Sequence, residues 1–175
     1  MGVQLIKRRL VTDTRGTFER LLEDAWMLPS DAGVHIQQVN RVLTRSTGTV
    51  RGMHLQLPPV SETKIVSCVQ GQVFDVVVDL RIDSATFGEW WGTELSESNA
   101  LTAVIPPGCA HGLQTLTPDV QMLYLHTARY CPSAEAGLNP LSTELGIRWP
   151  REVTKVSDRD RRESRSVDWF RSQQW

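Results

Sequence analysis

The sequence predicts an all-β sandwich or barrel. Short segments rich in β-branched residues recur along the chain, and Gly, Pro, Ser and Asn stand at the joints between them. At 175 residues with 40% hydrophobic content, the chain is most simply one domain, 1–175, that is long enough to bury a core. No internal repeat or linker divides it.

The amino-terminal third supplies the first predicted strands. Residues 5–11 predict a strand or an arm, and the Asp, Thr and Gly of residues 13–17 read as a turn. Residues 18–26 fit either a strand or a short helical turn, and residues 34–43 alternate in the manner of a strand.

Residues 49–56 predict a strand that carries chemistry. Strand alternation places His54 on the same face as Val50, Gly52 and Gln56, and opposite Arg51. A glycine inside a strand marks a bulge or the close approach of a ligand. Because a lone histidine is more often structural than catalytic, this stretch by itself leaves both functions open.

The strand pattern continues through the middle of the chain. The tight turn at Gly71 joins two of the predicted strands, and residues 106–112 predict a turn that contains His111. The predicted strands are 63–69, 72–80, 88–95, 101–105, 112–116 and 120–126.

The carboxyl-terminal part, residues 151–175, is strongly charged and ends in aromatic residues. Its charges alternate in sign, which favours a short helix or an ordered tail packed on the barrel over a nucleic-acid arm. The whole chain has 19 Lys plus Arg against 20 Asp plus Glu, so its charge indicates neither a nucleic-acid nor a membrane partner. Since there is no apolar run of about 18 residues and no secretion signal, we expect a cytoplasmic protein.

Metal and disulfide chemistry are poorly supported. Cys68, Cys109 and Cys131 are odd in number and widely spaced, which argues against a disulfide framework or a structural zinc site. A metal-binding barrel would need two or three histidines with a carboxylate, and neither His54 nor His111 begins a His-x-His pair. The sequence therefore predicts no metal.

Several motifs stand in one register from about residue 13 to residue 160. They are Asp13-x-Arg15-Gly16-x-Phe18, Gln38-x-Asn40, Arg51-Gly52-x-His54, Lys64, residues 73–81, residues 84–90, Ala110-His111-Gly112, Tyr124, Tyr130 and Ser157-Asp158-Arg159-Asp160. Together these motifs resemble the dTDP-4-dehydrorhamnose 3,5-epimerase family.

The resemblance implies a metal-free, cofactor-independent, cupin-type double-stranded β-helix (jelly-roll) barrel with short peripheral helices. It also implies a homodimer in which residues 1–12 form a strand-exchanging arm, while residues 151–175 form a packed tail. The implied reaction is epimerisation of a nucleotide-linked 4-keto-6-deoxyhexose, dTDP-4-dehydro-6-deoxyglucose, at C3 and C5 through an enolate.

The same resemblance assigns roles to individual residues. His54 would be the general base and Asp160 its orienting partner. Lys64 would face the keto oxygen, and Tyr124 would donate the proton. The residues implied to bind the sugar and the diphosphate are Arg15, Phe18, Gln38, Asn40, Arg51, His111, Tyr130, Glu135 and Arg159.

The chemistry of enolate formation accounts for these residue types without reference to the family. Removing a proton from carbon next to a carbonyl needs a base and a positive or hydrogen-bonding group at the oxygen that becomes an enolate. A carboxylate on the other imidazole nitrogen fixes the tautomer and stabilises the imidazolium. Inversion then needs a proton from the opposite face.

Departures from the family pattern leave the nucleotide base open. Thr17 and Arg20 stand where the family has an aromatic residue and a glutamate, and Leu55 replaces an aromatic residue. Three alternatives remain: a single-centre C3 or C5 epimerase, a 3,4-ketoisomerase of related barrel type, and a non-catalytic sugar-nucleotide-binding barrel.

Overall fold

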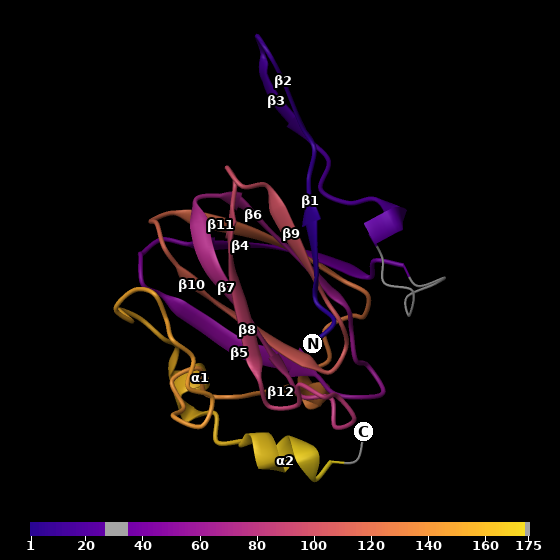
Figure 1. The fold of residues 1–175 in the computed structure, drawn as a ribbon, viewed down its shortest axis with the longest axis vertical. Coiled ribbons are helices and arrows are strands. Elements are labelled where there is room, and N and C mark those ends of the chain that lie inside the picture. Colours follow the sequence, from indigo (N-terminus) through magenta and orange to yellow (C-terminus); the bar gives the residue numbers. More distant parts are fainter. Residues whose placement is uncertain (27–34, 174–175) are drawn as a thin grey trace.

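The computed structural model describes residues 1–26 and 35–173. Two five-stranded antiparallel sheets form a barrel, a β-hairpin projects from it, and short helices lie at its periphery (Figure 1). The predicted jelly-roll fold is confirmed. No helix among the described residues is long and apolar enough to cross a membrane.

Each sheet brings together strands that are distant in sequence. The first sheet has the order β1 (Gln4–Lys7), β9 (Leu101–Ile105), β6 (Lys64–Gln70), β11 (Val120–His126), β4 (Gln38–Thr44). The second has the order β12 (Glu135–Gly137), β5 (Val50–Gln56), β10 (Cys109–Thr115), β7 (Gln72–Asp79), β8 (Trp90–Ser96). Tyr124 lies between Asn40 and Val66 in the first sheet.

Strand β7 shows why its sequence is almost continuously apolar. Val73 and Val77 belong to one buried cluster, whereas Val76 and Val78 belong to a second cluster that includes Phe170 from the carboxyl-terminal helix. A strand covered on both faces carries apolar residues at consecutive positions rather than at alternate ones. The second sheet is therefore packed on both sides.

The carboxyl-terminal segment supplies the outer cover of the second sheet. Helix α1 (Asp158–Arg162) begins at Ser157, whose hydroxyl accepts a hydrogen bond from the backbone N–H of Asp160. Helix α2 (Val167–Arg171) follows and inserts Phe170, which is fully buried. Among the described residues, the other short helical elements are the 3₁₀ turns η1 (Asp24–Trp26) and η3 (Pro132–Ala134).

The hairpin of β2 (Leu10–Asp13) and β3 (Gly16–Glu19) extends away from the barrel (Figure 1). Its base is held by Arg8, a fully buried side chain that forms an ion pair with Glu19 at 2.7 Å. Strand β1, just before it, pairs with β9 of the same chain. The single predicted segment 5–11 is thus divided between β1 and the hairpin.

Two predicted element boundaries were wrong. His111 lies inside strand β10, because the turn ends earlier, at Gly108, whose φ is +80°. The predicted strand 34–43 begins only at Gln38, and its residue 34 lies outside the described residues. Of the two alternatives for residues 18–26, the strand ends at Glu19 and a helical turn follows at 24–26.

Candidate active site

A cavity of about 240 Å³ opens between the two sheets. Its walls are formed by β4, β6 and β11 of the first sheet and by β5, β10 and β12 of the second. His54 comes from the second sheet, whereas Lys64 and Tyr124 come from the first. Groups of different chemistry therefore face one another across the cavity.

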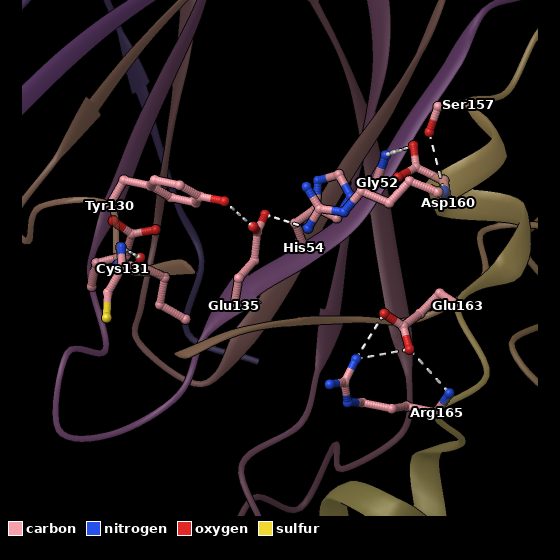
Figure 2. Close-up of polar contacts among 12 residues, drawn as sticks. Gly52, His54, Tyr130, Cys131, Glu135, Ser157, Asp160, Glu163 and Arg165 are labelled. Carbon is pink, nitrogen blue, oxygen red and sulfur yellow. Dashed lines mark hydrogen bonds and ion pairs between the residues drawn. The ribbon is translucent and has the colours of Figure 1, made fainter. Parts of the chain in front are cut away.

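His54 is paired with a carboxylate from the far end of the chain (Figure 2). Its Nε2 lies 2.8 Å from Oδ1 of Asp160, and Oδ2 of the same carboxylate accepts the backbone N–H of Gly52 at 3.3 Å. Burial raises the pKa of Asp160, but the hydrogen bond and charge of His54 and the N–H of Gly52 outweigh it, so the pKa lies below its usual value. An ionised Asp160 places the proton on Nε2 and leaves Nδ1 of His54 as the basic nitrogen.

A bulge in β5 corrects the predicted alternation of this strand. His54 is opposite His111 in β10, but Arg51 is opposite Leu113, so β5 has one more residue than β10 over this interval. The extra residue brings Arg51 and His54 to the same cavity rather than to opposite faces. Gly52 permits it, because a Cβ there would lie 2.6 Å from the Cα of Gly112.

Lys64 reaches across from the first sheet to the strand that carries His54. Its Nζ donates to the backbone carbonyl of His54 at 2.9 Å and lies 3.6 Å from Oε1 of Glu62. Burial lowers the pKa of Lys64, and the charge and hydrogen bonding of Glu62 act in the opposite direction.

Tyr124 lies between two histidines. Its ring stacks on His126 with centroids 6.2 Å apart and meets His111 edge-on at 5.8 Å. Burial, followed by the charge of Asp75, raises the pKa of Tyr124, so the phenol keeps its proton. His111 is itself fixed by a buried contact of 2.7 Å between its Nε2 and Oδ2 of Asp75.

The rim of the cavity carries an aromatic ring held by charged groups (Figure 2). The hydroxyl of Tyr130 donates to Oε2 of Glu135 at 2.6 Å, and Arg159 pairs with Oε1 of the same carboxylate at 2.6 Å. Burial raises the pKa of Glu135, but these two donors outweigh it and the pKa is lowered. The carboxylate is thus kept ionised between Tyr130 and Arg159.

A second groove, of about 460 Å³, shares Arg51 and His54 with the cavity. Arg45, Lys155 and Arg159 also line it, so positive charge gathers on this side of His54. Such a groove suits an anionic group attached to whatever occupies the cavity.

The structure brings together most of the residues singled out in the sequence. Two are placed elsewhere: Arg15 and Phe18 lie on the projecting hairpin, where Arg15 pairs with Asp13 and Phe18 is 64% exposed. The predicted residues that line the cavity or the groove, or bond to such residues, are His54, Lys64, Tyr124, Asp160, Gln38, Asn40, Arg51, His111, Tyr130, Glu135 and Arg159.

Sequence reasoning missed several polar residues of the site. His126 and Glu62 line the cavity, and Asp75 holds His111. Strand periodicity contained part of the signal, because His126 is two positions after Tyr124 and therefore shares its face. Among the described residues, no group of three or more His, Cys, Asp or Glu is arranged to hold a metal ion.

Comparisons with known proteins agree on one family. The family model described as dTDP-4-dehydrorhamnose 3,5-epimerase matches residues 1–167. A dTDP-4-dehydrorhamnose 3,5-epimerase of Sinorhizobium fredii is 40% identical over 159 residues, which are 90% of this chain and 82% of that protein. A dTDP-4-dehydrorhamnose 3-epimerase of Streptomyces niveus is 41% identical over 113 residues, covering 65% of this chain and 55% of the relative.

A solved structure is similar to this chain over most of its length. The crystal structure of dTDP-4-dehydrorhamnose 3,5-epimerase from Bacillus anthracis, with TDP and PPi bound, superposes with a TM-score of 0.85 at 34% identity. The match covers 93% of each chain.

Proposed function

Because this chain belongs to the dTDP-4-dehydrorhamnose 3,5-epimerase family, we propose that it inverts C3 and C5 of dTDP-4-dehydro-6-deoxyglucose in deoxysugar biosynthesis. It is an isomerase acting on carbohydrates, and its substrate is a nucleotide sugar. We propose both that the nucleotide is dTDP and that two centres, C3 and C5, are inverted.

The single observation that carries the proposal is the contact of 2.8 Å between His54 and Asp160 in a cavity shared with Lys64 and Tyr124. His54 removes the proton from carbon next to the ketone, and Asp160 stabilises the imidazolium that forms. The electron pair of the broken C–H bond moves into an enolate, whose oxygen is stabilised by the Lys64 ammonium. Tyr124 then protonates the same carbon from the other side.

The positions of base and acid on facing sheets support inversion. His54 belongs to β5 and Tyr124 to β11, so a sugar ring between the sheets presents opposite faces to them. After one turnover His54 carries the proton taken from carbon and Tyr124 lacks one, and exchange with water restores both. Each carbon needs only these two groups, without a cofactor.

The groove beside His54 supports recognition of a nucleoside diphosphate. Arg51 and Arg159 lie where a diphosphate would extend from a sugar in the cavity, and the Bacillus anthracis relative holds TDP and PPi. Tyr130, fixed at the rim by Glu135, offers a ring on which a base can stack. We propose dTDP as the nucleotide, with the sugar bound by Gln38, Asn40 and His111.

The projecting hairpin supports a homodimer. Arg15 and Phe18 are outside the cavity of their own chain, and the hairpin exposes Leu10, Val11 and Phe18. The predicted strand-exchanging arm, residues 1–12, is narrowed by the structure, because β1 pairs with β9 of its own chain. We propose that the hairpin of β2 and β3 crosses to a second copy and brings Arg15 and Phe18 to the partner's nucleotide. Residues 1–175 then act as one domain per chain, in the cytoplasm.

Deuterium exchange tests the reaction. The protein is incubated with dTDP-4-dehydro-6-deoxyglucose in D₂O, and proton NMR follows each sugar position. We expect deuterium at C3 and C5 for the native chain and at neither position for His54→Asn, with dTDP binding retained. Absence of exchange with every nucleotide 4-ketosugar tested, despite binding, would identify a non-catalytic binding barrel instead.

A single-centre enzyme is the second candidate, favoured by the identity to the Streptomyces niveus 3-epimerase. Both kinds of enzyme need the same base and acid, so the site does not separate them. The same NMR experiment does, because exchange at C3 without exchange at C5 would replace the proposed activity with 3-epimerisation.

A further inference from the structure

A carboxylate and a histidine in the cavity have no part in the proposed mechanism. Oε2 of Glu62 lies 3.0 Å from Nδ1 of His126, and their side chains are 6% and 13% exposed. Removing an ionised carboxylate from water costs several kcal/mol unless it is paired and hydrogen-bonded. Glu62 also faces Lys64, and His126 also faces Asn40.

A chain of hydrogen bonds fixes the proton positions along it. The backbone N–H of Tyr130 donates to Oε1 of Gln38, so the amide nitrogen of Gln38 is free to donate to Oδ1 of Asn40 at 3.1 Å. The amide nitrogen of Asn40 then faces Nε2 of His126 at 3.3 Å. Since an amide nitrogen can only donate, Nε2 accepts and His126 carries its proton on Nδ1, which donates to Glu62.

The other oxygen of Glu62 faces the ammonium of Lys64. An ammonium has three N–H donors. One is used by the carbonyl of His54 at 2.9 Å, and a second is available to Oε1 of Glu62, 3.6 Å from Nζ. The third is left for a substrate oxygen in the cavity. Glu62 therefore lies at the junction between the hydrogen-bond chain and Lys64.

We propose that Glu62 and His126 are positioning residues for Lys64. Glu62 keeps the buried ammonium charged and directed at the enolate oxygen, and His126, held by Asn40, fixes the orientation of Glu62. This inference rests on the proposed function for the role of Lys64 in turnover. It also connects Lys64 to Gln38, Asn40 and Tyr130, the residues proposed to contact the sugar and nucleotide.

The charges around Lys64 support Glu62 as its counter-ion. Burial lowers the pKa of Lys64, and Glu62 is the largest influence in the opposite direction, with Glu135 from β12 contributing less. The other titratable groups that line the cavity around Lys64 are His54 on β5, His111 on β10, and Tyr124 and His126 on β11, with Arg51 and Tyr130 farther along the wall.

Lysine NMR tests the link between Glu62 and Lys64 without substrate. The chain has only three lysines, Lys7, Lys64 and Lys155, so each ammonium signal can be followed through a pH titration. In Glu62→Gln we expect the Lys64 midpoint to move to lower pH, and in Glu62→Asp to move less. Glu97→Gln, which removes an exposed carboxylate, is the matched control and should leave the midpoint in place. An unchanged midpoint in Glu62→Gln overturns the proposal.

Histidine NMR tests the orientation of His126. In ¹⁵N-labelled protein, the nitrogen shifts distinguish the two neutral tautomers of each of the four histidines. We expect His126 to carry its proton on Nδ1, in contrast to His54 and His111, whose Nε2 atoms face carboxylates. Assignment uses the signal lost in His126→Gln. A proton on Nε2 of His126 overturns its proposed place in the chain.

Kinetics separate failure of this inference from failure of the proposed function. In Glu62→Gln we expect kcat to fall, by about tenfold for each pH unit above the new Lys64 midpoint, while the affinity for dTDP stays unchanged. A native kcat in Glu62→Gln overturns the inference and leaves the epimerase assignment intact. If the native chain shows no exchange at all, the assignment fails, and the lysine titration still decides whether Glu62 controls the charge of Lys64.

Discussion

At the scale of single residues, the site depends on which atom of Asp160 faces which donor. Oδ2 accepts the backbone N–H of Gly52, so Oδ1 is the atom left for Nε2 of His54. In Asp160→Asn, the amide oxygen must stay with Gly52, and the amide nitrogen then faces His54. Because that nitrogen donates, it forces Nε2 to accept and moves the imidazole proton to Nδ1, the nitrogen that should act as the base.

We therefore expect Asp160→Asn to lower kcat by roughly 10⁴-fold, the scale of the same exchange in another His–Asp pair. The measurement is the rate of deuterium exchange at saturating substrate. Calorimetric binding of dTDP serves as the control and should be unaffected, because the nucleotide does not depend on the tautomer of His54. A loss of dTDP binding in proportion to kcat would mean that Asp160 shapes the groove instead.

Tyr124 has a different expected signature, because it acts after the C–H bond is broken. Burial raises the pKa of Tyr124, which suits a group that donates its proton only when an enolate is beside it. In Tyr124→Phe, His54 can still remove a proton and return a deuteron from the same face. We expect deuterium exchange with retention of configuration, and a much smaller yield of inverted sugar, both read by NMR. Equal loss of exchange and inversion would contradict this division of labour.

At the scale of elements, the bulge of β5 is the feature that turns a strand into part of a site. Gly52 has φ of +114°, and a Cβ there would meet the Cα of Gly112 at 2.6 Å and the carbonyl oxygen of His111 at 2.7 Å. Both contacts are to backbone, which cannot move without shifting β10. Gly52 thus allows the close approach that places Arg51 beside His54.

We expect Gly52→Ala to destabilise the protein by about 3 kcal/mol or more, and to lower exchange activity as well. Gly146→Ala is the matched control: its φ is also positive, at +57°, but the nearest atom to the added Cβ is 3.9 Å away. Its expected cost is about 1 kcal/mol, that of a left-handed conformation alone. Urea unfolding compares the two, and equal costs would show that the contact with β10 is unimportant.

The same elements show how far the sequence can be interpreted. Alternation and β-branched runs predicted most strands, because the central strands of both sheets are buried in the barrel. The turn containing His111 was wrong because Pro106 and Gly108 are strong turn residues and the strand resumes only one position after Gly108. Alternation also failed for Arg51, since a single inserted residue reverses every side chain that follows.

The pairing of His54 with Asp160 was predictable only through the family resemblance. Asp160 is 106 positions from His54, and strand periodicity carries no information over that interval. Glu62 sits in a loop after two prolines, where a carboxylate usually faces water, and only packing against β11 buries it beside His126. Asp75 offered a local signal: a charged residue inside an apolar strand requires a buried partner, which proved to be His111.

At the scale of the whole molecule, the two sheets and the carboxyl-terminal segment form the site jointly. The first sheet provides Lys64 and Tyr124, and the second provides His54. The carboxyl-terminal segment brings Asp160 to His54 and anchors itself through Phe170, whose burial stabilises the fold by about 1.5–3 kcal/mol. Activity and folding of the tail are therefore expected to be lost together.

The projecting hairpin of β2 and β3 lies outside the cavity of its own chain. If it completes the site of a second copy, defects in arm and cavity should complement each other when they lie on different chains. One chain carries His54→Asn and has an intact arm. The other carries both Arg15→Ala and Phe18→Ala and has an intact cavity. Each is expected to be inactive or strongly impaired alone, with dimers verified by light scattering.

Co-expression with two affinity tags isolates the mixed dimers. In these, the intact arm of the His54→Asn chain meets the intact cavity of the other, so deuterium exchange should return. The control combines His54→Asn with Asp160→Asn: because these residues contact each other within one chain, no cavity in such a dimer is whole and activity should stay absent. Failure of the first pair to regain activity, or native activity of the arm variant alone, would show that Arg15 and Phe18 do not act across the dimer.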